Sequence, residues 1–187
     1  MLNSILIGLA VLAVLVVVFL IFVALRPTSF FIARSTAIEA PPEAVFAQVN
    51  DLRKWQAWSP YDQRDPAMQR TYTGSSEGVG ASYAWNGNNE VGEGRSTITE
   101  SRANDLIVIR LEFKRPFAAT NTAEFTFQAA DNSTAVTWSL RGKYNFVTQA
   151  VGLFLNMDKM IGGDFETGLA NLKRVVEAQG SAKVAVH

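Results

Sequence analysis

The first part of the chain contains no charged side chain from Leu2 to Leu25. Twenty-four helical residues would extend about 36 Å, which crosses the ~30 Å hydrocarbon core of a bilayer with some tilt. The stretch has no polar face for packing in a water-soluble core, and it is longer than the ~7–15-residue apolar region of a signal peptide. The sequence therefore predicts a transmembrane anchor at residues 1–26, which contacts the membrane through residues 2–25.

The basic residues beside this stretch predict its orientation. Arg26 and Arg34 follow it, whereas residues 1–4 contain no Lys or Arg. Because Lys and Arg near a span favour the cytoplasmic side, we expect a single-pass membrane protein with a cytoplasmic domain. Pro27 ends the helix, since proline cannot continue its hydrogen-bond ladder. Residues 27–32 are expected to form a linker and the start of the first strand.

Strand patterns with short connections follow one another through the middle of the chain. Strands are predicted at 30–40, 70–73, 81–85, 92–101, 106–114, 121–129 and 135–141. Most connections are rich in Gly, Asn and Asp, which favours hairpins and an antiparallel meander. Alternation points one set of side chains inward: Tyr83, Trp85, Ile98, Ile107, Ile109, Leu111, Phe113, Phe125, Phe127, Val136, Trp138 and Leu140. A sheet with one apolar face needs a partner layer.

Helical segments supply that layer. Prolines 41 and 42 with Glu43 predict the start of one short helix, and residues 52–58 predict a second. Residues 61–69 are polar and predict a loop. Residues 154–176 place their apolar side chains on one face at helical spacing. The expected fold is therefore α+β, with about seven curved antiparallel strands wrapped on a long C-terminal helix and one transmembrane helix before them.

Composition excludes several classes of function. Seventeen basic residues balance seventeen acidic ones, so the chain lacks the excess positive charge of a nucleic-acid-binding protein. It has no cysteine, and its single histidine is His187. A thiolate site, a histidine metal cluster or a histidine-based catalytic triad is therefore not expected. The glycine-rich segments do not match a phosphate-binding loop. The sequence predicts no metal, no cofactor and no nucleic-acid partner.

Several segments resemble a known superfamily. They are 40–46 (APPEAVF), 55–60 (WQAWSP), 78–87, 92–94 and 157–169. Over about residues 33–178 the chain resembles the START-like superfamily, often called SRPBCC, and within it the polyketide cyclase/dehydrase-like branch. The resemblance implies a helix-grip fold, in which the sheet and the last helix enclose a cavity for apolar or amphipathic molecules. We assign residues 33–180 to this domain and 181–187 to a flexible tail.

The residues that could line such a cavity are aromatic, apolar or isolated polar side chains. The candidates are Trp55, Trp58, Tyr83, Trp85, Arg95, Phe113, Phe127, Trp138, Phe154, Met157, Asp158 and Ile161. The simpler interpretation is that most of the aromatic residues form an ordinary core. Asp158 falls near the apolar stripe of the last helix. It could be an acid of the first turn, or a polar anchor at the cavity entrance paired with Arg95 or Arg141.

Three functions are compatible with these observations. The first is a membrane-anchored protein that binds a hydrophobic or amphipathic, lipid-like small molecule in the helix-grip cavity. The second is a cyclase- or dehydrase-type enzyme that uses Asp158, Arg95 or Tyr83. The third is a regulatory partner of another membrane protein, with the cavity filled by its own side chains. No catalytic residue is assigned, because no titratable pair with evident roles is present.

Overall fold

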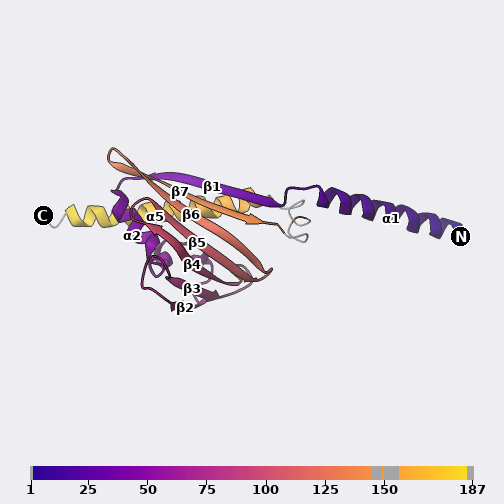
Figure 1. Ribbon diagram of the computed structural model, residues 1–187, viewed down its shortest axis with the longest axis horizontal. Helices are drawn as coiled ribbons and strands as arrows, with labels where there is room; N and C mark the ends of the chain where they lie inside the picture. Colours follow the sequence, from indigo (N-terminus) through magenta and orange to yellow (C-terminus); the bar gives the residue numbers. More distant parts are fainter. Residues whose placement is uncertain (1, 145–148, 150–155, 185–187) are drawn as a thin grey trace.

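The computed structural model describes residues 2–144, 149 and 156–184, and shows a long N-terminal helix that leads into an α+β domain (Figure 1). The helix is α1 (Leu2–Ala24). The domain contains β1 (Ser29–Ile38), α2 (Pro42–Asn50), the 3-10 helix η1 (Lys54–Ala57), α3 (Pro60–Arg64), β2 (Gln69–Thr73), β3 (Ser82–Asn86), β4 (Glu93–Arg102), β5 (Leu106–Arg115), β6 (Ala119–Ala130), β7 (Ser133–Lys143) and α5 (Met157–Val184).

The strands form one seven-stranded sheet in the order β1-β7-β6-β5-β4-β3-β2, and every neighbouring pair is antiparallel. Helix α5 covers one face of this sheet (Figure 1). The predicted α+β fold, with a curved antiparallel sheet and a long C-terminal helix, is confirmed. We call the face toward α5 the inner face. The side chains that alternation points inward are all buried or packed against the core.

The two ends of the sheet differ in what lies next to them. At the proximal end are the start of β1, the end of β7 and the β3–β4 and β5–β6 connections, on the side from which α1 extends (Figure 1). At the distal end are α2 and the β2–β3, β4–β5 and β6–β7 connections. Helix α5 runs in the same direction as β1, because Arg34 bonds to Asp158 near its start and Lys173 donates to the Ala37 carbonyl.

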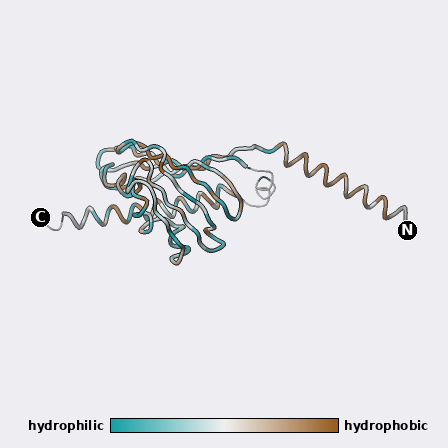
Figure 2. The backbone as a smooth tube through the Cα atoms, turned by 60° about the horizontal axis from the view of Figure 1, so that its bottom comes forward, coloured by the Kyte–Doolittle hydropathy of each residue, from teal (hydrophilic) through white to brown (hydrophobic). Residues whose placement is uncertain are grey.

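Helix α1 is apolar along its length. Its segment Ile5–Ala24 is long and apolar enough to cross a membrane. In Figure 2 the longest continuous hydrophobic stretch of the backbone follows α1, whereas hydrophilic and hydrophobic residues alternate in the domain. The large side chains from Ile5 to Phe22 are exposed. In water this surface would be unfavourable, and in a bilayer it is the ordinary lipid-facing surface of a helix.

Two segments differ from the sequence expectation. Residues 60–64 form α3, so the loop predicted at 61–69 is wrong for the first of these residues. Pro60 does not simply end the preceding helix. It occupies the first turn of a new one, where its missing N–H costs nothing. Helix α5 continues to Val184, so residues 181–184 are helical. Residues 185–187 of the predicted tail lie outside the described residues.

Two glycines of α5 give a matched test of how closely the helix packs. A Cβ at Gly168 would lie 2.7 Å from Trp138 Cζ3 and 3.1 Å from Pro60 Cδ, whereas a Cβ at Gly163 would meet nothing within 4 Å. Gly168→Ala should therefore destabilise the protein by about 1–2 kcal/mol through overpacking. Gly163→Ala should stabilise it by about 0.5–1 kcal/mol through helix propensity. Urea unfolding in detergent measures both, and equal effects would contradict the close packing of Gly168 on Trp138.

Candidate functional site

An aromatic cluster fills the middle of the space between the sheet and α5. Its members are Trp55, Trp58, Phe125, Trp138 and Phe165, and each is at least nine-tenths buried. Trp138 stacks on Phe165 with ring centroids 4.1 Å apart, and on Phe125 at 4.9 Å. Trp55 and Trp58 contact each other at 4.9 Å, and Trp58 meets Trp138 edge to face at 5.8 Å. In the middle of the domain, aromatic side chains therefore fill the space between the sheet and α5.

Toward the proximal end the inner face is less completely covered. We define the proximal inner face as Phe30, Leu111, Phe113, Asn121 and Gly142. The three apolar side chains are only partly buried, and all pack against the core. A side chain at Gly142 would overlap the Asn121 amide and the Phe30 ring, so glycine leaves room there for both. This face is therefore an apolar surface with one amide group in it.

Two polar atoms of the interior have no hydrogen-bond partner among the described residues. They are Asn121 Oδ1 on the proximal inner face and Trp138 Nε1 in the aromatic cluster. A buried polar atom without a partner costs roughly 1–3 kcal/mol. Buried polar atoms of this kind often receive their missing hydrogen bond from a ligand or an ordered water. Asn121 Oδ1 accepts and Trp138 Nε1 donates, so a bound molecule could meet either requirement.

A buried ion pair closes the β2 side of the interior. Arg70 Nε donates to Asp62 Oδ1 at 2.8 Å, and Arg70 Nη1 donates to the Met68 carbonyl at 2.8 Å. Tyr83 stacks between Tyr72 and Trp85 at 5.3 and 5.9 Å. Burial, together with the negative charge of Asp62, raises the pKa of Tyr83. The phenol therefore stays protonated near neutral pH and is available only as a hydrogen-bonding group.

The start of α5 is fixed by Arg34 of β1. Its Nη2 donates to Asp158 Oδ2 at 3.0 Å and its Nε donates to Glu166 Oε1 at 2.7 Å. A side chain at Gly162 would overlap the Arg34 guanidinium, so glycine permits this close approach. The bond from Arg34 holds the pKa of Asp158 below its ordinary value. The predicted pairing of Asp158 with Arg95 or Arg141 is wrong, because strand alternation points Arg34, and not those residues, toward α5.

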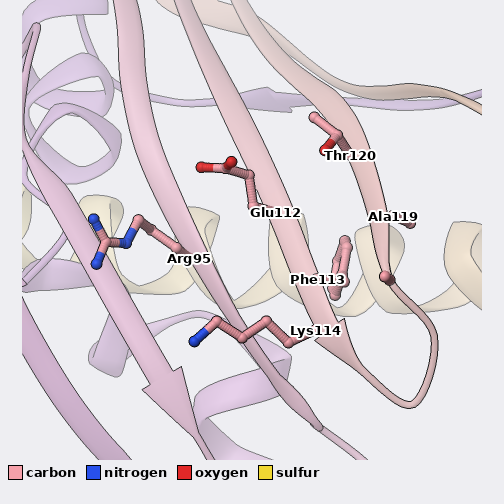
Figure 3. Close-up of a pocket in the computed structure, with 7 residues that line it drawn as sticks. Arg95, Glu112, Phe113, Lys114, Ala119 and Thr120 are labelled. Atoms are coloured by element: carbon pink, nitrogen blue, oxygen red, sulfur yellow. The ribbon is translucent and has the colours of Figure 1, made fainter.

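Arg95 and Arg141 both lie on the outer face of the sheet. Arg141 donates to Glu124 at 2.9 Å. Arg95 is exposed and lines an open depression of about 640 Å³, with Glu112, Phe113, Lys114, Ala118, Ala119 and Thr120 as the other lining residues. Figure 3 views this depression with α5 behind the strands, and shows Arg95 and Lys114 on neighbouring strands. Its lining is mixed, with three charged side chains beside Phe113 and two alanines.

The predicted cavity residues therefore separate into groups. Trp55, Trp58, Phe127 and Trp138 belong to the buried core, as do Tyr83 and Trp85 near its β2 side. Phe113 and Ile161 are partly buried against that core, and Met157 is half-buried at the start of α5. Asp158 is exposed beside Arg34, Arg95 is on the outer face, and Phe154 lies outside the described residues. Ligand binding by any of them stays a prediction.

Sequence reasoning missed three residues of the proximal inner face, namely Phe30, Asn121 and Gly142. In the sequence, Phe30 and Asn121 mark only the starts of predicted strands. Their common position follows from register, since Phe30 lies opposite Gly142 and Leu111 opposite Asn121. The alternation of β6, which points Ala123 and Phe125 inward, could have placed Asn121 on the same face.

The described residues of the candidate site offer an apolar surface with hydrogen-bonding groups. Among residues 2–144, 149 and 156–184, no group of three or more His, Cys, Asp or Glu side chains could hold a metal ion. Asp158, the proposed acid, lies on α5, whereas Arg95, the proposed cation, lies on the opposite, outer face of the sheet, so the two do not point to a common site. What the site can do chemically is exclude water from an apolar molecule and bond its polar end.

Comparisons with solved structures agree with the fold. The protein SA2116 from Staphylococcus aureus is 10% identical with a TM-score of 0.61, and the match covers 82% of this chain and 96% of that one. Protein CV1439 from Chromobacterium violaceum is 14% identical with a TM-score of 0.56, covering 81% and 99%. The Aha1 dimer from Colwellia psychrerythraea is 15% identical with a TM-score of 0.54, covering 79% and 96%. At these identities the likeness concerns the fold alone.

The family comparison is more direct. No curated protein matches the chain. A family model described as polyketide cyclase / dehydrase and lipid transport matches residues 31–177, which is most of the chain and the whole sheet from Phe31 through most of α5. The resemblance seen in the sequence is thereby confirmed. The chain belongs to the polyketide cyclase / dehydrase and lipid transport family.

Proposed function

We propose that this protein is a membrane-anchored binding protein that holds a hydrophobic or amphipathic, lipid-like small molecule between its sheet and α5. The observation that carries the proposal is the proximal inner face, where partly buried apolar side chains surround an amide oxygen that has no partner among the described residues. The family description, which includes lipid transport, supports the same class of ligand.

The chemistry of this face defines the ligand class. Phe30, Leu111 and Phe113 would contact an apolar body, and each buried CH₂ group contributes about 0.8 kcal/mol. Asn121 Oδ1 would accept a hydrogen bond from a hydroxyl or amine at the polar end of the molecule. The buried ion pair of Asp62 and Arg70 is already satisfied by its neighbours, so a formal charge on the ligand is not required.

The anchor of the proposed protein is α1. Seventeen Leu, Ile, Val and Phe residues lie between Ile5 and Leu25, and at ~0.3–0.6 kcal/mol each they favour insertion by roughly 5–10 kcal/mol. A cytoplasmic domain follows from Arg26 and Arg34 after the span. A membrane anchor would keep the binding site close to a source of apolar molecules, which a freely diffusing carrier would have to reach by collision.

Native mass spectrometry of the full chain, extracted in mild detergent, tests the proposal. We expect a co-purifying apolar molecule, released on denaturation and identified in the organic extract. Leu111→Ser should lower its occupancy at least several-fold, because it places a hydroxyl on the proximal inner face. Arg110→Ser, one residue away on the outer face, is the matched control and should retain the ligand. An empty protein that also fails to bind a panel of lipids would exclude the proposed function.

A further inference from the structure

We propose that the proximal end of the domain rests on the anionic headgroups of the same membrane, with Phe117 of the β5–β6 hairpin inserted at the interface. This contact rests on the proposed function only in requiring that α1 spans the membrane. It adds a second contact with the bilayer, made by the folded domain. Three independent features support it: linker length, exposed apolar side chains and the distribution of charge.

Linker length brings the domain to the membrane surface. Helix α1 ends at Ala24 and β1 begins at Ser29, so residues 25–28 alone connect them. At 3.3–3.6 Å per extended residue the connection spans at most about 18 Å. The headgroup layer on each side of the hydrocarbon core is roughly 5–8 Å thick, and electrostatic attraction extends about 8–10 Å further. The start of β1 and the strand ends next to it are therefore within reach of the lipid headgroups.

Exposed apolar side chains gather at this end. Outside α1, the large hydrophobic side chains that are exposed in the described part of the chain are Leu25, Phe31, Val79, Phe117 and Met160. Leu25 is in the linker, Phe31 is near the start of β1, Phe117 is in the β5–β6 hairpin, and Met160 is in the first turns of α5. The hairpin end of β5 and β6 points toward the side of α1 in Figure 1. Val79 alone of the five lies at the distal end, in the β2–β3 connection.

The interface is a favourable place for such residues. A soluble domain exposes few large apolar groups without a partner, and several at one end indicate an interaction surface. Phe31 is 64% exposed and Phe117 is 45% exposed. An aromatic ring on a hairpin tip is well suited to the boundary between headgroups and acyl chains, where membrane-binding segments place Trp, Phe and Leu. These observations favour a lipid surface as the occupant.

The two ends of the domain differ in net charge, and the basic end is the one that would face anionic lipid. Near the proximal end are the basic residues Arg26, Lys114, Arg115, Lys143 and Lys159 and the acidic residues Asp65, Glu90, Glu93 and Asp158. At the distal end are the acidic residues Glu39, Glu43, Asp51, Glu77, Asp105, Asp131 and Glu177 and the basic residues Arg53, Lys54, Arg102, Lys173, Arg174 and Lys183. The proximal end is thus net basic and the distal end net acidic, although the chain as a whole is neutral.

Several of the proximal cations are available to bind phosphate. Arg26, Lys143 and Lys159 form no ion pair with any residue in the described part of the chain. Lys114 and Arg115 share Glu93, at 3.0 and 3.4 Å, so one acid serves two bases. Lys114 is 73% exposed and stands close to Phe117 in the sequence. A basic and aromatic hairpin tip of this kind can hold an anionic headgroup while its ring enters the interface.

The orientation has a consequence for the binding site. The proximal inner face lies at the end that would rest on the membrane, because Phe30 and Phe113 belong to the strand ends there. A lipid-like molecule could then move between the bilayer and the inner face without crossing bulk water. Contact of the distal end with the membrane would leave the same face pointing away from the lipid.

Site-specific labelling of the full chain tests the orientation. The chain contains no cysteine, so F117C and V79C each introduce a unique thiol. Each variant is labelled with an environment-sensitive fluorophore and reconstituted into vesicles of phosphatidylcholine, with or without phosphatidylglycerol. We expect blue-shifted emission and quenching by headgroup-spin-labelled lipid for F117C in vesicles with phosphatidylglycerol. The V79C label, at a similarly exposed apolar position of the distal end, should stay accessible to aqueous iodide.

Charge-reversal variants test whether the hairpin binds anionic headgroups or only lies near the membrane surface. Adding Lys114→Glu and Arg115→Glu to F117C should lower its lipid quenching several-fold, whereas Arg53→Glu with Lys54→Glu at the distal end should leave it unchanged. Equal quenching with and without phosphatidylglycerol would overturn the role of anionic lipid. A chain that resists carbonate extraction while its F117C label is as iodide-accessible as V79C would overturn this inference alone. A chain that carbonate removes would overturn the transmembrane anchor as well.

Discussion

Replacing Trp138 with alanine should lower the free energy of unfolding by about 3–5 kcal/mol, the range for truncating a large buried aromatic side chain. Trp138 is 3% exposed and touches Phe125, Phe165 and Trp58. Its removal would leave a cavity between the sheet and α5 that the surrounding rings can fill only in part. Urea unfolding of the full chain in detergent, followed by circular dichroism, measures the loss.

Two further variants test whether the loss of stability comes from the burial of the Trp138 ring. Phe31→Ala removes an aromatic ring that is 64% exposed on β1 and should change stability by less than about 0.5 kcal/mol. Trp138→Phe keeps a ring in the stack and removes the indole N–H that has no partner among the described residues, so its cost should be well below that of alanine. If Trp138→Ala were as mild as Phe31→Ala, Trp138 would not lie at the centre of the core.

Two arginines in α1 should remove the protein from the membrane. Leu12→Arg combined with Val14→Arg places two charges near the middle of the helix, at about 2.5–3.5 kcal/mol each. Together with the lost apolar side chains, this cost of about 6–8 kcal/mol is comparable to the whole insertion free energy of α1. We expect the carbonate-resistant fraction of the chain to fall from most of the protein to a small part of it.

A control variant with the same added charge outside α1 tests whether the effect is specific to α1. Val79→Arg with Thr99→Arg adds the same two charges at positions of the domain away from α1, and the membrane fraction should not change. Retention of the α1 double variant in the carbonate-resistant fraction would mean that α1 does not span the bilayer. The domain would then have to reach the membrane by its surface alone, which labelling at positions 117 and 79 detects separately.

Together these experiments address the two halves of the proposed function. The aromatic cluster of Trp55, Trp58, Phe125, Trp138 and Phe165 is tightly packed, and we expect its substitution to lower stability. The proximal inner face, with Leu111 and Asn121, is where a ligand would supply the hydrogen bond that Asn121 Oδ1 lacks. Loss of stability from the first set and loss of ligand from the second would separate core from binding site.

The candidate site shows where sequence reasoning succeeds and where it fails. Alternation correctly turned Phe113, Phe127 and Trp138 toward α5, because side-chain direction in a strand has a fixed period of two. The choice of Arg95 as an inward partner failed for the same reason, since it lies between the inward-facing Gly94 and Ser96. Alternation within β4 could have excluded it. The pairing of Asp158 with Arg34 could not be found that way.

The apolar span, the order of the strands, every helix except α3, the inner face of the sheet and the family could be predicted from the amino-acid sequence. Each of these depends on local patterns, which a single segment carries without reference to the rest of the chain. Tertiary structure alone decided that Arg34 reaches Asp158 and Glu166 across 124 and 132 positions of the chain. It also decided that the aromatic cluster fills the middle of the interior, and that basic and apolar residues from segments far apart in the sequence lie at the end facing α1. Such contacts depend on strand register and on the angle at which α5 crosses the sheet, and neither is written in any one segment.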